Sequence, residues 1–304
     1  MSALLASDSV IGILATKGAV YRSSVGESMI GLAERYLLGR DVSRGYAGNI
    51  RRTAAKMDRA GITPANINGP AVSMWLSSLK ANGLSSVSIA SERRSAITIW
   101  KFGIEDGSIT TPIRHVLQPR VTRRVTRAFG RDDLTGAVKR LKELILPAFQ
   151  SGCCRKQWIE AWIFYVYETG ARFTDAYELR SEALVPGGVG WTASKTGRPV
   201  IKRLSASTSD RLAALASLSP DGTVFKWAVS RRHAFAAIRA VFKQIGLDGG
   251  RTQWLRRSGA THAEMIKKGA AREYLCHATQ GLAESNYIDF TQLLPELPVP
   301  PGIE

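Results

Sequence analysis

The stretch RKQWIEAWIFYVYETGAR, residues 155–172, carries the strongest structural pattern in the chain. Its large apolar residues lie three or four positions apart, on one face of a helix: Trp158, Trp162, Tyr165 and Val166. Gly170 follows them, and glycine is the residue that most easily adopts the left-handed conformation with which many helices end. The stretch therefore predicts a helix buried in a core that ends at Gly170, with Arg172 just beyond its end.

Residues 132–290 are expected to form one domain around this helix. The clearest strand pattern, GVGWTASKTGRPVIKRLS at residues 188–205, has two β-prone runs on either side of the turn-like tetrapeptide Lys195–Arg198, which predicts a hairpin. Further helical patterns surround it, at residues 134–149, 209–218, 227–245 and 253–268. The predicted fold class is mainly α with a small β-sheet, in other words α+β.

The preceding residues read as a separate domain, and a chain of 304 residues is long enough for two. Residues 27–113 contain four helical patterns with basic outward faces. Residues 114–131, RHVLQPRVTRRVTRAFGR, carry six arginines and no acidic residue, and Pro119 discourages a helix, so an extended basic linker is expected there. Residues 1–26 form an N-terminal extension, and residues 291–304 form an apolar, Pro-rich tail.

The chain is strongly basic. Its 42 Lys and Arg residues face 25 Asp and Glu residues, which gives a formal charge of +17 and a pI near 10.2. Nucleic acid is the strongest candidate for an anionic partner, because Lys and Arg release the counterions condensed on its phosphates. An anionic membrane surface is the rival, but no basic amphipathic helix or membrane-spanning run supports it. RNA is possible on charge alone.

The three cysteines indicate neither a disulfide framework nor a zinc site. Cys153 and Cys154 are adjacent, and Cys276 lies far away in the sequence. The first twenty residues are mildly apolar but lack the basic start of a signal peptide. These features favour a reducing, cytoplasmic compartment.

Basic side chains on the helical faces and along the linker are the candidate DNA contacts. Ordinary solvation is a sufficient explanation for any one charged face. Because the whole chain is strongly basic, contact with phosphates explains these faces about equally well. The candidates are Arg44, Arg51, Arg52, Lys56, Arg93, Arg120, Arg123, Arg124 and Arg127.

Cutting DNA without a metal requires a nucleophile, fixed cationic donors for the phosphate oxygens and a proton for the leaving 5′ oxygen. Arginine suits the second role, since its planar guanidinium donates two parallel hydrogen bonds and keeps its charge. The second domain offers candidates for every role: Arg172, Lys195, Arg256, His277 and Tyr287, with Asp175 and Gln253 beside them. Taken singly, each is better explained as structural; Arg172 and Asp175, for example, are spaced as a helical ion pair.

The order of these segments resembles the catalytic domain of the tyrosine recombinases, the phage integrase family. The matching segments are TGAR at 169–172, Asp175, KTG at 195–197, WLR at 254–256, KG at 268–269, LCH at 275–277 and Tyr287. The resemblance covers roughly residues 130–290 by motif, and the helical residues 27–113 are less specifically similar to the family's core-binding domain. Each motif alone is weak, whereas the five that carry Arg172, Lys195, Arg256, His277 and Tyr287 are strong when they occur in this order.

The resemblance implies a role for each matching residue. Tyr287 would attack the scissile phosphate and form a 3′-phosphotyrosine, and two adjacent arginines would favour both its phenolate and the transition state. Arg172 and Arg256 would hold the non-bridging oxygens, and Lys195 would protonate the leaving 5′ hydroxyl. His277 would hydrogen-bond the phosphate or help to place the tyrosine.

Three further residues complete the comparison. The resemblance implies that Asp175 orients the residues of the site without contacting the phosphate itself. Gln253 stands where the family usually has histidine, and glutamine can donate a hydrogen bond to a phosphate oxygen but cannot carry a proton at neutral pH. Cys276 replaces the usual glycine before the histidine, which affects how that turn is built.

The resemblance also implies a homotetramer on two double-stranded DNA sites, with the C-terminal tail either exchanged between subunits or packed on its own domain. No metal or other cofactor and no membrane partner is expected. The expected location is the cytoplasm, with the protein nucleoid-associated or phage-encoded. Two alternatives remain: a type IB topoisomerase that relaxes supercoils as a monomer, and a DNA-binding protein without catalysis. The helical first domain and the chain length favour the recombinase.

Overall fold

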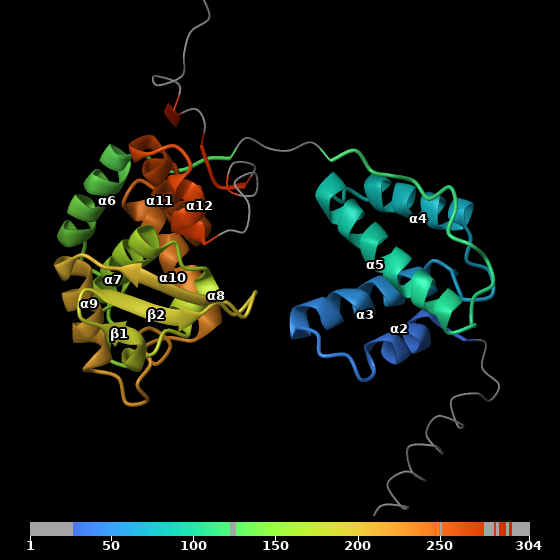
Figure 1. Cartoon of the computed structure of the whole chain (residues 1–304), viewed down its shortest axis with the longest axis horizontal. Helices are drawn as coiled ribbons and strands as arrows, with labels where there is room; N and C mark the ends of the chain where they lie inside the picture. The colour runs from blue at the N-terminus through green and yellow to red at the C-terminus, as the bar shows by residue number, and fades with distance from the viewer. Residues whose placement is uncertain are drawn as a thin grey trace, which may run out of the picture. The chain divides into compact units, whose positions relative to one another are not determined.

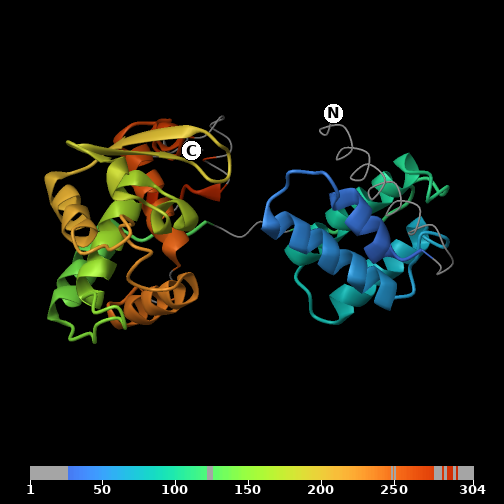
Figure 2. The same ribbon diagram turned by 90° about the horizontal axis from the view of Figure 1, so that it is seen from below.

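The computed structural model describes residues 27–121, 126–247, 249, 251–276, 283, 286–289 and 292–293. The chain divides into two compact units, Met1–Arg123 and Arg124–Glu304, each with a hydrophobic core of its own. Figures 1 and 2 show the elements of each unit from two sides. The predicted extension, and the predicted tail apart from residues 292 and 293, lie outside the described residues. The DNA-binding and catalytic roles assigned to the two parts stay predictions.

The first unit contains the four predicted helices. They are α2 (Met29–Leu37), α3 (Arg44–Arg59), α4 (Gly69–Ala81) and α5 (Ser86–Glu105). Each begins after a residue whose side chain accepts a hydrogen bond from a backbone N–H in the first turn: Ser28, Ser43, Asn68 and Ser85. Their apolar faces meet in a core in which Leu32, Ile50 and Trp100 are fully buried.

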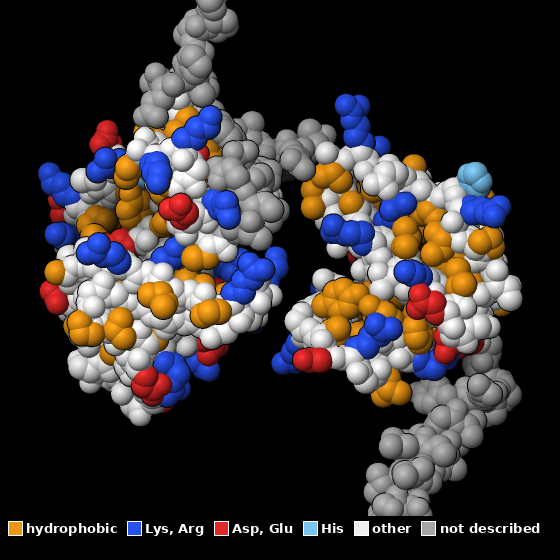
Figure 3. All heavy atoms as spheres, in the orientation of Figure 1, with side chains coloured by type: hydrophobic (Ala, Val, Ile, Leu, Met, Phe, Trp, Pro, Cys, Tyr) orange, Lys and Arg blue, Asp and Glu red, His pale blue; other side chains and the backbone are white. Residues whose placement is uncertain are grey.

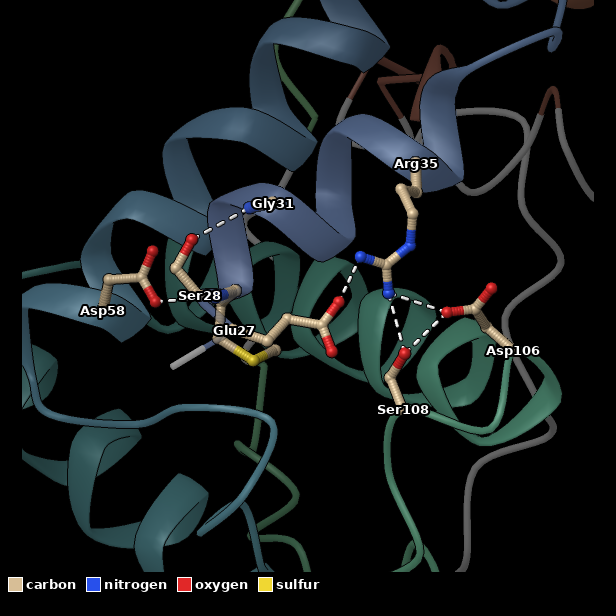
Figure 4. Close-up of polar contacts among 8 residues, drawn as sticks. Glu27, Ser28, Gly31, Arg35, Asp58, Asp106 and Ser108 are labelled. Atoms are coloured by element: carbon tan, nitrogen blue, oxygen red, sulfur yellow. Dashed lines mark hydrogen bonds and ion pairs between the residues drawn. The ribbon is translucent and has the colours of Figure 1, made fainter. Parts of the chain in front are cut away.

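Carboxylates tie α2 to its neighbours in this unit (Figure 4). The carboxylate of Asp58, on α3, accepts hydrogen bonds from the N–H groups of Met29 at 2.7 Å and Ile30 at 3.0 Å. It thereby satisfies two of the four amides that a helix leaves unpaired at its N-terminus and opposes the positive end of the helix dipole. Further along α2, Arg35 donates to Asp106 at 2.7 Å, just after α5.

The second unit is built around the helix predicted from residues 155–172. Its described elements are α6 (Arg131–Glu143), α7 (Arg155–Thr169), α8 (Phe173–Tyr177), η1 (Ser181–Ala183), β1 (Leu184–Val185), β2 (Gly188–Thr192), β3 (Pro199–Arg203), α9 (Ala206–Ala216), α10 (Arg231–Gln244), α11 (Thr252–Ile266) and α12 (Ala270–Leu275). On α7, Trp158, Trp162 and Tyr165 are fully buried. The strands form an antiparallel sheet in the order β1-β2-β3, which covers one side of the helices (Figure 2).

The predicted linker, residues 114–131, is shorter than expected. Phe129 is 5% exposed within the core of the second unit, and its N–H donates to Oγ of Ser258 at 2.8 Å. On the other side, the N–H of Leu117 donates to Oγ of Ser73 in the first unit at 2.8 Å. Because a ring buried in a core cannot belong to a free strap, the boundary predicted at residue 132 lies too late in the chain.

Two further differences concern the lengths of elements. The helix predicted over residues 134–149 ends at Glu143, before Pro147, whose ring disfavours helical backbone at and before it. The short elements α8, β1 and α12 were not predicted, because two to six residues are too few for a periodic pattern. None of the helices in the described ranges is long and apolar enough to cross a lipid bilayer.

Replacing Asp58 with alanine should lower the free energy of unfolding by about 1–2 kcal/mol, because two amides at the start of α2 lose a charged acceptor. Thermal and denaturant unfolding of the full chain would measure the change. Asp41→Ala, at an exposed position between α2 and α3, is the matched control and should have almost no effect. Equal stability of the two variants would contradict the role given to Asp58.

Candidate active site

The end of α7 and the start of α8 form a corner that carries Arg172. Gly170 ends α7 in the left-handed conformation, with φ 63° and ψ 23°, and Arg172 precedes α8 with an extended backbone. A Cβ atom on Gly170 would lie 2.7 Å from the ring of Tyr274, so the close approach requires glycine as much as the backbone angles do. The predicted arginine stands at this corner with 28% of its side chain exposed.

Asp175 joins this corner to the β2–β3 hairpin. Its side chain is 2% exposed, Oδ1 accepts a hydrogen bond from the N–H of Ser194 at 2.9 Å, and Oδ2 lies 3.8 Å from Nη1 of Arg172. The hairpin forms where it was predicted, and Gly197 in its loop has a left-handed φ of 64°. One buried carboxylate therefore fixes both the guanidinium of Arg172 and the backbone beside Lys195.

Gln253, Arg256 and Arg257 share one face of α11, since they are three and four residues apart. Arg256 is 5% exposed. Its guanidinium donates to the carbonyl oxygen of Gly170 and, at 3.5 Å, to that of Leu275. These carbonyls lie at the C-terminal ends of α7 and α12, where helix dipoles favour a cation. Two helix ends therefore take the place of water around this buried charge.

Tyr287 packs directly against Arg256. The Cζ atom of Arg256 lies 5.0 Å from the centroid of the tyrosine ring, which is within the range of a cation–π contact. Burial lowers the pKa of Arg256 from its ordinary value, and the nearby Tyr287 acts in the opposite direction. The tyrosine is half-buried, and its N–H donates to the carbonyl oxygen of Ala283 at 2.9 Å.

A polar cavity of about 900 Å³ connects these segments. It is lined by the predicted residues Arg172, Lys195, Gln253 and Tyr287. Among the described residues, every charged side chain that lines it is a cation, and Figure 3 shows Lys and Arg side chains gathered at the end of the β2–β3 hairpin. Within the described ranges, no group of three or more His, Cys, Asp or Glu is placed to hold a metal. A cavity of this charge favours a polyanion.

The sequence reasoning missed two cations of this cavity, Arg198 and Arg257. Arg257 is half-buried, and burial lowers its pKa while the nearby Tyr287 opposes that change. Its Nε atom is buried and makes no hydrogen bond within the part of the chain that the structure describes. The i, i+4 spacing from Gln253 is the signal that could have identified Arg257, and Arg198 closes the tetrapeptide already singled out as a turn.

The turn before the predicted histidine has the left-handed backbone that favours glycine, although a cysteine, Cys276, occupies it. Cys276 ends α12 in the left-handed conformation, with φ 52° and ψ 43°, and lines the cavity. This conformation costs a residue with a Cβ atom about 1–2 kcal/mol. His277 itself lies outside the described residues, so its place in the site stays a prediction.

The predicted DNA contacts differ in how far they are available. Arg44, Arg120 and Arg127 are exposed, Arg52 is exposed and donates to Asn49, Arg93 is partly buried, and Arg123 and Arg124 lie outside the described residues. Arg51 donates to Glu34 at 2.7 Å and 3.0 Å, and Lys56 pairs with Glu92. A phosphate would therefore have to compete with a carboxylate at two positions of α3.

Comparison of the sequence with protein-family models finds no match. Comparison with curated proteins finds no match either.

Solved structures do share the fold. A lambda integrase dimer bound to a COC′ core site matches with a TM-score of 0.68 at 17% identity, over 85% of this chain and 76% of that one. The XerH site-specific recombinase bound to its difH substrate matches with a TM-score of 0.67 at 12% identity, over 90% and 97%. The Tn1549 transposon integrase in complex with a circular intermediate DNA matches with a TM-score of 0.61 at 11% identity, over 89% and 100%. The fold class predicted from the sequence, that of the tyrosine recombinases, is confirmed.

Replacing Asp175 with alanine should loosen the hairpin loop, because the amide of Ser194 loses its buried acceptor, at a cost of about 1–3 kcal/mol. Hydrogen exchange across residues 193–198 would measure the loosening. The exposed Asp210 on α9 provides the control, since Asp210→Ala removes a carboxylate from the same unit without touching the hairpin. Unchanged exchange in the Asp175 variant would show that the carboxylate does not hold the loop.

Proposed function

We propose that this chain, which has the fold of the tyrosine recombinases, is a site-specific DNA recombinase that cuts and rejoins double-stranded DNA through a 3′-phosphotyrosine intermediate. The observation that carries the proposal is the position of Tyr287, which rests on the buried guanidinium of Arg256 and lines a cavity whose charged side chains, in the described part of the chain, are all cations. A phenol in such surroundings is suited to attack a phosphodiester, because negative charge develops where positive charge is already fixed.

The cations have distinct proposed tasks. Arg172 reaches the cavity from the corner between α7 and α8 and would hold a non-bridging oxygen of the scissile phosphate. Arg256 lies outside the cavity lining, against the ring of Tyr287, and donates to two carbonyl groups; a guanidinium has five N–H donors, so binding a phosphate oxygen as well as these carbonyls is compatible with its chemistry. Arg257 would add a further donor on the same helical face, beside Tyr287.

The leaving 5′ oxygen needs a proton, and Lys195 is the proposed donor. It is exposed in the β2–β3 hairpin loop and lines the cavity, so its ammonium group can approach a phosphate bound there. Gln253, also in the cavity, can donate a hydrogen bond but no proton. Proton transfer is therefore assigned to Lys195, while Gln253 and His277 would help to hold the phosphate.

The proposed assembly is a homotetramer on two DNA sites. Its support is the shared fold, since a lambda integrase of that fold is a tetramer bound to a Holliday junction. Exchange of the C-terminal tail between subunits is part of the same proposal, as are a cytoplasmic location with chromosomal or phage DNA as the partner and a reaction that needs no cofactor. The phosphotyrosine conserves the energy of the phosphodiester bond, so rejoining requires no nucleotide.

Tyr287→Phe should abolish the covalent protein–DNA adduct and leave DNA affinity nearly unchanged, because the ring stays and only the attacking oxygen is lost. A suicide duplex made from the sequence that flanks the gene would trap the adduct for a denaturing gel. Tyr177→Phe, which removes a hydroxyl bound to the carbonyl oxygen of Val229 outside the cavity, is the control. An adduct formed by the Tyr287 variant would refute the assignment of the nucleophile.

Arg172→Ala should slow adduct formation by about 10²- to 10³-fold, which is the usual effect of removing one donor from a transition-state oxyanion site. Arg180→Ala removes an exposed arginine of the same unit that is paired with Glu182, and it should retain nearly the full rate. Single-turnover cleavage with saturating protein separates the chemical step from binding. A near wild-type rate in the Arg172 variant would exclude its role at the phosphate.

A further inference from the structure

A buried carboxylate lies two residues after Tyr287. Asp289 is 4% exposed, and its Oδ2 accepts hydrogen bonds from the N–H of Ala128 at 2.9 Å and from Nε2 of Gln292 at 3.3 Å. A buried carboxylate is costly unless hydrogen bonds satisfy it, and an apolar residue of similar size would often be at least as stable. We therefore look for the role of Asp289 in the groups that it holds in place, and not in stability.

Ala128 lies near the start of the second unit, in residues 126–130, which we call the entering segment. It is held at two neighbouring amides: Ala128 by Asp289, and Phe129 by Oγ of Ser258 on α11. Gln292 adds a bond from its Nε2 to the carbonyl oxygen of Ala128 at 3.1 Å. We call residues 286–289 the tyrosine segment. The entering segment and the tyrosine segment lie far apart in the sequence but are hydrogen-bonded directly to each other.

The tyrosine segment is in turn attached to α11 through Thr261. The hydroxyl of Thr261 accepts from the N–H of Asp289 at 2.9 Å and lies 3.4 Å from the carbonyl oxygen of Tyr287, to which it donates. A hydroxyl has one proton and two lone pairs, so both bonds can form at once. We call Ala128, Thr261 and Asp289, whose bonds reach the tyrosine segment, the α11 clasp.

The clasp and the site share a helix. Ser258 and Thr261 follow Arg256 on α11, and Arg256 lies under the ring of Tyr287. The backbone on the C-terminal side of the tyrosine is therefore fixed to the same rigid element that carries the guanidinium. Positioning to within about 1 Å decides whether a nucleophile reacts, and an error of that size can reduce a rate by about a hundredfold.

We propose that Asp289 is a positioning residue for Tyr287, which it holds over Arg256 by fastening the tyrosine segment to the entering segment at Ala128. This inference rests on the proposed function and extends it, since it makes the first described residues of the second unit, 126–130, part of the support of the nucleophile. It assigns Asp289 no contact with DNA and no proton transfer. Loss of Asp289 should therefore lower the rate of the chemical step.

The test compares three variants of the full chain. Asp289→Ala removes the bond to Ala128, Asp289→Asn keeps an amide oxygen that can accept it, and Ser258→Ala loosens Phe129 without touching the tyrosine segment. Each would be measured for affinity to the suicide duplex, for the single-turnover rate of adduct formation and for amide hydrogen exchange at residues 126–130 and 286–289.

The expected result is a loss of about tenfold to a hundredfold in adduct formation for Asp289→Ala, with affinity within about twofold of wild type. Asp289→Asn should recover most of the rate. Ser258→Ala should show faster exchange at residues 126–130 but keep most of its rate. The inference is overturned if Asp289→Ala cleaves like wild type, or if it and Ser258→Ala lose rate to the same extent, since the effect would then be one of general stability.

Failure of the proposed function would look different. If wild type forms no adduct, the recombinase assignment fails, and hydrogen exchange alone decides the inference. Asp289→Ala should then accelerate exchange at residues 286–289 and at residues 126–130 together. Acceleration at residues 126–130 alone would show that the carboxylate does not hold the tyrosine segment.

Discussion

The buried guanidinium of Arg256 is the constraint on which the arrangement of the second unit depends. A charge with 5% exposure must be stabilised by the protein, and here the carbonyl oxygens of Gly170 and Leu275 do so at the ends of α7 and α12. Both helices must therefore end at the same place. The corner that carries Arg172 follows the first end, and the turn at Cys276 follows the second. One cation thus determines where several chain segments change direction.

Close packing around this point explains two glycines. Tyr274 lies against both: a Cβ added at Gly170 would be 2.7 Å from a ring carbon of Tyr274, and one added at Gly259 would be 2.0 Å from its hydroxyl oxygen, which donates to the carbonyl oxygen of Tyr167. Burial raises the pKa of Tyr274, so the phenol stays neutral. A neutral, hydrogen-bonded phenol is an acceptable neighbour for a buried guanidinium, and the missing side chains let α7, α11 and α12 approach each other closely enough to surround it.

Much of this could be predicted from the sequence, for identifiable reasons. Long helices such as α7 have a regular spacing of apolar residues, and helix ends and turns are marked by residues such as Gly170 and the tetrapeptide Lys195–Arg198. These features depend on residues close together in the chain, so the sequence predicts them directly. The candidate site residues were predicted from their order along the chain, and Arg172, Lys195 and Tyr287 line one cavity, while their roles stay predictions. Arg257 was missed because the motif singles out only its neighbour Arg256, and the spacing of four residues from Gln253 is a weak signal beside it. The burial of Phe129 was missed because it depends on contacts with α11, more than a hundred residues away.

The place of Phe129 and Ala128 also bears on how the second unit can be joined to other proteins. A fusion of this unit to a foreign domain needs a junction, and the change in composition near residue 132 is the obvious one. A chimaera cut there would discard the ring that fills the core and the amide that Asp289 binds. Its partner would need to supply both, so the transferable cassette begins before residue 128, inside the arginine-rich stretch itself.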